Sequence, residues 1–194
     1  MARPREFDEA VVLEKAARVF WAHGYEGSSL ADLCEGTGLT KGSLYKAFED
    51  KRGLYLRALE HYMTEGRANL EERIRNAPSG LAGLEAWVRM AGGMACRGGP
   101  NGGCFAVNAT VELGPNDPEV QARIARHEAL VEGAYARALE RAQREGEVRA
   151  DLDPAQGARY VAVLVHGMQA LGRGALRPED VDTIVEAGLR SLRI

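Results

Sequence analysis

Apolar residues recur along the chain at steps of three and four, and alternating runs of β-branched residues are lacking. This spacing places apolar side chains on one face of a helix, whereas a half-buried strand needs a step of two. Gly and Pro divide the pattern into segments. The sequence therefore predicts an all-α fold of about nine helices, at residues 8–23, from Ser28 onward, 41–48, 51–76, 81–96, 105–113, 118–145, 154–171 and from Pro178 onward.

The two short helices after Ser28 are separated by the tight turn Glu-Gly-Thr-Gly-Leu at residues 35–39. Two helices joined by a glycine-containing turn are the pattern of a helix-turn-helix, whose second helix enters the major groove of DNA. The apolar residues of this segment can form the small core that fixes the angle between the helices: Leu30, Leu33, Leu39, Leu44 and Phe48.

The first two turns of the second short helix carry the polar residue types that bind DNA. Hydroxyls of Thr40 and Ser43 can donate to phosphates or base edges, and Lys41 and Lys46 attract phosphates. Tyr45 offers a hydroxyl to a phosphate and a ring to a thymine methyl group. Gly42 lets the backbone approach a duplex. Ser28 and Ser29 at the start of one helix, and Lys51 at the start of another, can bind phosphates. The predicted DNA-binding set is Ser28, Ser29, Thr40, Lys41, Gly42, Ser43, Tyr45, Lys46 and Lys51.

The positions of the lysines support this assignment, whereas the net charge of the chain does not. The net charge is −3, which does not indicate nucleic-acid binding, but every lysine lies in the first 52 residues. Arg3 and Arg5 precede the first predicted helix, where they form either an uninvolved tail or an arm that touches the backbone or the minor groove.

Residues 29–54, from Ser-Leu-Ala-Asp-Leu-Cys to Asp-Lys-Arg-Gly-Leu, resemble the DNA-binding signature of TetR-type repressors, and residues 17–28 resemble its first helix and turn. The resemblance covers about residues 8–60. It implies a three-helix DNA-binding domain at 1–52 and a helical-bundle ligand-binding and dimerisation domain at 53–194. The family often has His where this chain has Lys46, an exchange that preserves a phosphate contact.

The segment 102–113 resembles the sixth helix of one branch of this family, in which a Gly-Cys pair opens the helix. A cysteine at a helix N-terminus tends to a lowered pKa, because the helix dipole favours the thiolate. Cys104 is therefore a candidate for a reactive or ligand-contacting thiol. The alternatives are a small residue packed against the glycine loop and a redox pair with Cys96.

An effector site is expected between helices of the C-terminal bundle. Cys34, Cys96 and Cys104 lack the paired spacing of a zinc site, and His127 and His166 have no neighbour at metal spacing, so neither metal nor cofactor is expected. Most members of the search set can equally be core residues. The predicted ligand-binding set is Tyr62, Trp87, Met90, Met94, Cys104, Phe105, Asn108, Glu112, Tyr135 and His166, with Met63 and Met168 beside it.

The eighth and ninth predicted helices are too apolar to face water on their outer sides, and small residues let another helix come close: Gly157, Ala158, Ala162, Gly167 and Ala170. We therefore expect a symmetric homodimer through these helices. A two-fold axis would hold two DNA-binding heads about one DNA turn apart, roughly 34 Å, to read a palindrome.

These features predict a ligand-responsive transcriptional repressor that a small apolar or electrophilic effector releases from operator DNA. The effector would act by changing the tilt of the helix at 51–76. The alternative is a redox or electrophile sensor that works through Cys104 with the same DNA output. A helix pair in a protein–protein module is less favoured. An enzyme is not expected, since no nucleophile–base–acid set or phosphate loop occurs. No membrane span or secretory signal is found, so we expect a cytoplasmic protein.

Overall fold

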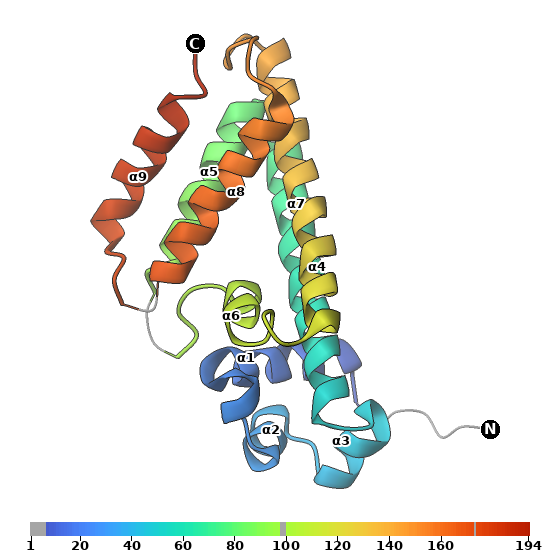
Figure 1. The fold of residues 1–194 in the computed structure, drawn as a ribbon. Coiled ribbons are helices and arrows are strands. Elements are labelled where there is room, and N and C mark those ends of the chain that lie inside the picture. Colours follow the sequence, from blue (N-terminus) through green and yellow to red (C-terminus); the bar gives the residue numbers. More distant parts are fainter. Residues whose placement is uncertain (1–6, 98–99, 173) are drawn as a thin grey trace, which may run out of the picture.

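The computed structural model describes residues 7–97, 100–172 and 174–194. Over these residues the chain forms helices and no strand, which confirms the predicted all-α class; the single β-bridge joins Val148 to Arg193. Figure 1 shows the arrangement of the nine described helices. They are α1 (Glu9–Gly27), α2 (Leu30–Thr37), α3 (Lys41–Phe48), α4 (Lys51–Asn76), α5 (Gly80–Ala95), α6 (Phe105–Glu112), α7 (Pro118–Arg144), α8 (Pro154–Leu171) and α9 (Pro178–Arg190).

Side-chain caps explain where several helices begin. The hydroxyl of Thr40 accepts the amide of Ser43, and the Asp50 carboxylate accepts the amide of Gly53. Such bonds satisfy amides that have no partner within the helix. Because these signals are local in sequence, the predicted ranges of α3 and α4 are confirmed to the residue.

The prediction that Ser28 caps the second helix was wrong. Ser29 is the capping residue, and it exchanges hydrogen bonds with Asp32 in a capping box. Ser28 is buried, and its hydroxyl donates to the Gly24 carbonyl at 2.6 Å. Gly24 does interrupt the first helix, with φ 75° and ψ 175°, but a further helical turn follows and α1 ends at Gly27.

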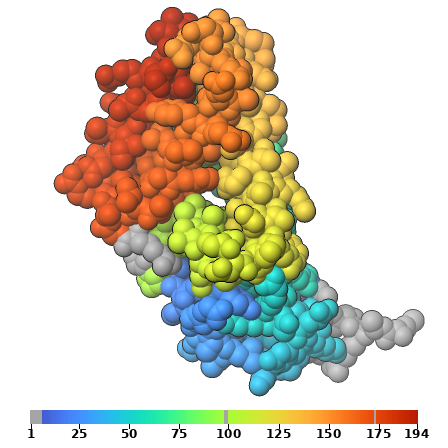
Figure 2. Space-filling view, in the orientation of Figure 1, coloured from blue at the N-terminus to red at the C-terminus, as the bar shows by residue number. Residues whose placement is uncertain are grey.

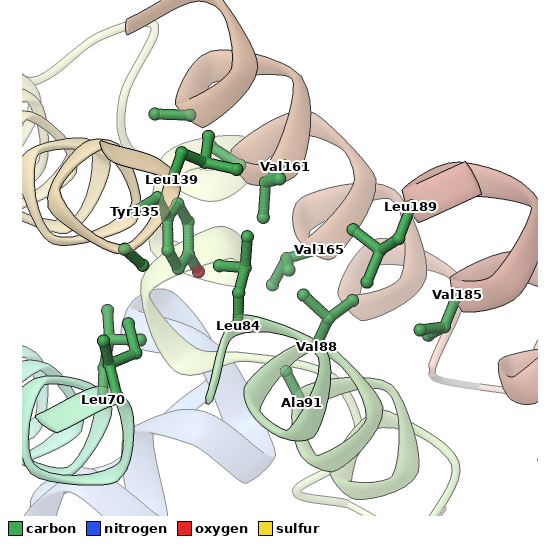
Figure 3. Close-up of a cluster of buried hydrophobic side chains, with 14 of the residues drawn as sticks. Leu70, Leu84, Val88, Ala91, Tyr135, Leu139, Val161, Val165, Val185 and Leu189 are labelled. Carbon is green, nitrogen blue, oxygen red and sulfur yellow. The ribbon is translucent and has the colours of Figure 1, made fainter. Parts of the chain in front are cut away.

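Two hydrophobic cores lie along the molecule. The upper core joins α5, α7, α8, α9 and the second half of α4, and Figure 3 shows Leu84, Val88, Tyr135 and Val161 meeting there. The lower core joins α1, α2, α3 and the first half of α4. It also takes in α6 and the start of α7. The long helix α4 therefore connects both cores (Figure 1).

The lower core uses residues from both predicted domains. Phe20, Leu33 and Leu44 come from the first 52 residues, whereas Phe105 and Val120 come from the C-terminal part. The predicted domain boundary between residues 52 and 53 falls inside the first turn of α4, so no break in the helix marks it, and it stays a prediction. None of the helices among the described residues is long and apolar enough to cross a membrane.

Candidate nucleic-acid interface

The helix α3 is anchored on one side and open on the other. Leu44 and Phe48 are buried in the lower core with Leu33, and the partly buried Leu30 and Leu39 pack beside them, so the predicted core of the helix-turn-helix is confirmed. The opposite side of α3 and its cap is exposed. We call this set the recognition face: Thr40, Lys41, Gly42, Tyr45 and Lys46.

The recognition face offers donors together with an aromatic ring. Tyr45 is 45% exposed, and the Lys41 Nζ lies 5.8 Å from its ring centroid. The Thr40 hydroxyl donates to the half-buried Ser43 hydroxyl at 3.0 Å. A Cβ atom built on Gly42 would meet nothing within 4 Å, so the backbone of this turn is open to an approaching molecule.

Lys51 sits at the first position of α4, beside the end of α1. Its Nζ lies 4.5 Å from the ring centroid of Tyr25, a cation–π contact that orients the side chain. The carboxylate of Asp50 already caps this helix start. Tyr25 is thus a supporting residue that the sequence did not single out, because the contact joins residues 26 positions apart and only folding brings them together.

Two predicted DNA contacts differ in their surroundings. Ser29 is exposed and caps α2. Ser28 is 2% exposed and bonded to Gly24, so its side chain is not available to a phosphate in this conformation. Arg3 and Arg5 lie outside the described residues.

Three of the predicted ligand-binding residues meet where α6 begins. The Tyr62 hydroxyl donates to the Cys104 sulfur at 3.5 Å, and the Tyr62 and Phe105 rings pack edge to face with centroids 5.6 Å apart. Trp21, from α1, packs against Tyr62 at 5.3 Å. Its indole donates to the Gly102 carbonyl at 3.2 Å.

The surroundings of Cys104 contradict the expectation that its thiol has a lowered pKa. Cys104 does begin α6 as the N-cap residue, but its side chain makes no capping hydrogen bond. The residue is buried, and burial raises the pKa of its thiol although Tyr62 and the amides of Val107 and Ala106 act in the opposite direction. Desolvation therefore outweighs the helix terminus, and the thiol is held neutral. The pKa of Cys96 is also raised by burial.

Other predicted ligand residues form polar pairs elsewhere in the bundle. The Trp87 indole donates to the Tyr135 hydroxyl at 2.9 Å. His166 lies 3.2 Å from Glu128, a partner that the sequence did not reveal. The buried Nδ2 of Asn108 has no hydrogen-bond partner among the described residues. Figure 2 shows an opening where α6, α7 and α8 meet.

The remaining members of the predicted ligand-binding set make no hydrogen bond or ion pair with these residues in the described part of the chain. Met90 is half-buried, and Met94 is 39% exposed near the end of α5. Glu112 is exposed on α6, and its carboxylate accepts the amides of Tyr25 and Glu26. Met63 and Met168 are core residues. Within the described part of the chain, no group of His, Cys, Asp and Glu side chains is arranged to hold a metal ion.

A compact helix-turn-helix with an open, basic second helix, joined to a larger helical bundle, defines a DNA-binding transcription regulator. The family model of bacterial regulatory proteins of the tetR family matches residues 12–58. The model of the tetracyclin repressor-like C-terminal domain matches residues 80–187. The chain therefore belongs to the TetR family of transcription regulators, and it is not an enzyme.

Individual relatives agree with this membership. The chain is 35% identical over 163 residues to the HTH-type transcriptional regulator YezE of Bacillus subtilis (strain 168), covering 83% of this chain and 84% of YezE. It is 30% identical to the HTH-type transcriptional repressor ComR of Escherichia coli (strain K12), covering 97% and 90% of the two chains. A solved structure of the TetR-family regulator CifR, a cysteine mutant complexed with 26-base-pair operator DNA, matches with a TM-score of 0.84 and 29% identity, covering 97% of this chain and 99% of that one.

Proposed function

We propose that this regulator is a cytoplasmic repressor that binds a palindromic operator as a homodimer and leaves it when a small effector binds. The recognition face carries the proposal, because its lysines, tyrosine and open glycine backbone all lie on the exposed side of α3. Lysines there neutralise phosphates, and the exposed side of a short helix is what a major groove admits. The likeness to CifR, solved on its operator, supports the same docking.

The outer side of α8 supports the homodimer. Tyr160, Val163 and Leu171 are 42%, 65% and 50% exposed, and their spacing puts them on one stripe. Gly167 lies within this stripe, and a Cβ there would meet nothing within 4 Å, so a second helix could approach closely. An apolar stripe of this kind is covered by another subunit in helical oligomers.

The small residues of α8 divide between two roles. Gly157, Ala158 and Ala162 are buried within the protomer, where a Cβ on Gly157 would lie 2.8 Å from Leu139. Gly167 and Ala170 are exposed and remain available to a partner. The proposed dimer interface therefore includes fewer of the small residues of α8 than the sequence suggested.

The effector is proposed to bind between α4, α5, α7 and α8, near Tyr62, Trp87, Tyr135 and His166. These side chains combine large apolar surfaces with a few hydroxyl, indole and imidazole groups, which suits a small, mostly apolar molecule. Tyr62 belongs to α4, the helix that also starts at the DNA-binding head. A ligand that prefers another tilt of α4 would weaken operator binding by its differential affinity, typically ~1–3 kcal/mol.

Fluorescence anisotropy with the promoter region beside the gene tests the DNA-binding proposal. We expect specific binding that weakens steeply with salt, in contrast to a scrambled duplex of equal length. Tyr45→Ala should weaken binding about tenfold, which corresponds to about 1.4 kcal/mol. Lys46→Ala should weaken binding to all sequences and reduce the slope of log affinity against log salt by about 1.

Arg75→Ala is the matched control, because Arg75 is exposed on α4 about 36 Å along the helix from Lys51. This variant should bind the operator like the unmodified protein. Equal affinity for operator and scrambled DNA at moderate salt, or equal losses in the Arg75 and Lys46 variants, would contradict the proposal.

A further inference from the structure

The C-terminal part of the chain holds the end of α1 through one carboxylate. Glu112, the last residue of α6, accepts the amide of Tyr25 at 3.0 Å with Oε2 and the amide of Glu26 at 3.1 Å with Oε1. These residues are 87 and 86 positions apart in the sequence. Both bonds join a charged acceptor to backbone donors, which is a stronger type of hydrogen bond than one between neutral groups.

The break at Gly24 creates the site that Glu112 occupies. Because Gly24 has φ +75°, the helical ladder is interrupted and the amides of the following turn point outward as donors. A Cβ on Gly24 would lie 2.8 Å from the Glu112 Oε1, so glycine is needed both for the backbone angle and for the close approach of the carboxylate.

The turn that Glu112 holds leads directly into the DNA-binding helices. Three residues after Tyr25, the buried Ser28 bonds back to Gly24, and Ser29 then starts α2. Tyr25 also carries the Lys51 side chain against its ring. A shift of α6 would therefore move the start of α2 and the environment of Lys51 together.

We propose that Glu112 is a positioning residue for operator binding, through which α6 sets the orientation of α2 and α3 against the C-terminal bundle. The inference rests on the proposed operator binding, and it adds a second connection to the one that α4 provides. α6 also carries Cys104 and Phe105 at its other end, beside Tyr62. An effector near Tyr62 would thus reach the head through α6 as well as through α4.

If the charge of Glu112 were its only contribution, removing the carboxylate would tighten operator binding, whereas a positioning role predicts weaker binding. The reason for the first effect is that an acid near the DNA-binding head repels phosphates. Glu26 provides a matched control, because it is an exposed acidic residue in the same turn. Its side chain makes no hydrogen bond or ion pair among the described residues.

The experiment compares Glu112→Ala and Glu26→Ala with the unmodified protein in operator titrations at several salt concentrations. We expect Glu112→Ala to weaken specific binding threefold to tenfold with an unchanged salt slope, because no phosphate contact is lost. Glu26→Ala should bind equally or more tightly. Hydrogen exchange of the Tyr25 and Glu26 amides in the free protein should quicken at least fivefold in Glu112→Ala only.

Operator affinity that stays equal or rises in Glu112→Ala would overturn the proposal, and so would an equal loss in both variants. Unchanged exchange of the two amides would overturn it as well. If the unmodified protein bound no specific DNA, the proposed function itself would fail. The exchange measurement would then still show whether Glu112 holds the end of α1, so the two failures are distinguishable.

Discussion

At the residue scale, we propose that Gly42 serves DNA binding at the expense of stability. Glycine in a helix interior costs roughly 0.5–1 kcal/mol relative to alanine, and the open surroundings of Gly42 give no packing reason for it. Gly42 lies in the first turn of α3, so Gly42→Ala should raise the free energy of unfolding by at most about that amount in urea denaturation. It should weaken operator binding, because the methyl group occupies space that the duplex would approach. Tighter operator binding by this variant would contradict the docking of α3.

The chemistry of Cys104 can be tested without knowledge of the effector. Because burial raises the pKa of the thiol, Cys104 should react more slowly with a disulfide reagent at pH 8 than the half-buried Cys34 does. The rate should increase as the pH rises toward the raised pKa. Because the chain has three free cysteines, Cys34→Ser, Cys96→Ser and Cys104→Ser variants are compared to assign each phase to its thiol. A fast phase that disappears in Cys104→Ser would favour the electrophile-sensor alternative.

The comparison of Ser28, Ser29 and Glu112 explains what local sequence can predict. A capping residue and its partner lie within three positions, so helix starts are readable, although two adjacent serines leave the choice between them open. The sequence places Glu112 in the predicted ligand-binding set. Its true partners lie 86 and 87 residues away, and no local pattern indicates them.

At the scale of elements, Arg52 at the start of α4 forms ion pairs with two acidic residues at the start of α7. Arg52 donates to Asp117 at 2.5 and 3.1 Å with two nitrogens, and to Glu119 at 2.9 Å. Arg52 and Asp117 lie 65 positions apart, so no local pattern in the sequence indicates this pair. Like the Glu112 contact and the Trp21–Gly102 hydrogen bond, this ion pair connects the DNA-binding head to the bundle.

Asp117→Asn tests this ion pair, because asparagine can still cap α7 while losing the charge. Arg52 lowers the pKa of Asp117 from 3.8 to about 2. The stabilisation from this group is therefore complete above about pH 4 and is lost as the pH falls toward 2. In urea denaturation the variant should be less stable by roughly 1 kcal/mol at pH 6. The difference should shrink below pH 4, and a difference that grows on acidification would contradict this account.

At the scale of the whole molecule, the proposed operator binding requires two DNA-binding heads held together by one dimer interface. Val163→Arg places a charge in the exposed stripe of α8 and should convert the dimer to monomer in sedimentation velocity. The loss of the second head should also weaken operator binding strongly. Val111→Arg is the control, because Val111 is 74% exposed on α6 and Val163 is 65% exposed. A monomeric unmodified protein, or dissociation of both variants, would refute the proposed interface.

The overall architecture was predictable because helix periodicity, caps and the helix-turn-helix pattern are all local. The assembly of the lower core was not, since Phe105 and Val120 join α1 and α4 only through tertiary packing. The ligand set was the least predictable part. Aromatic and methionine residues at helical spacing have the same pattern whether they line a ligand site or fill a core, as Met63 and Met168 do.

Methylation interference on the operator tests the central claim most directly, because methyl groups at guanine N7 block contacts in the major groove. Two α3 helices related by a two-fold axis should give two interference patches whose centres lie about 10 base pairs apart, on the same face of the duplex. Lys46→Ala should weaken binding without moving either patch. A single patch, or interference confined to the minor-groove N3 of adenine, would contradict the account.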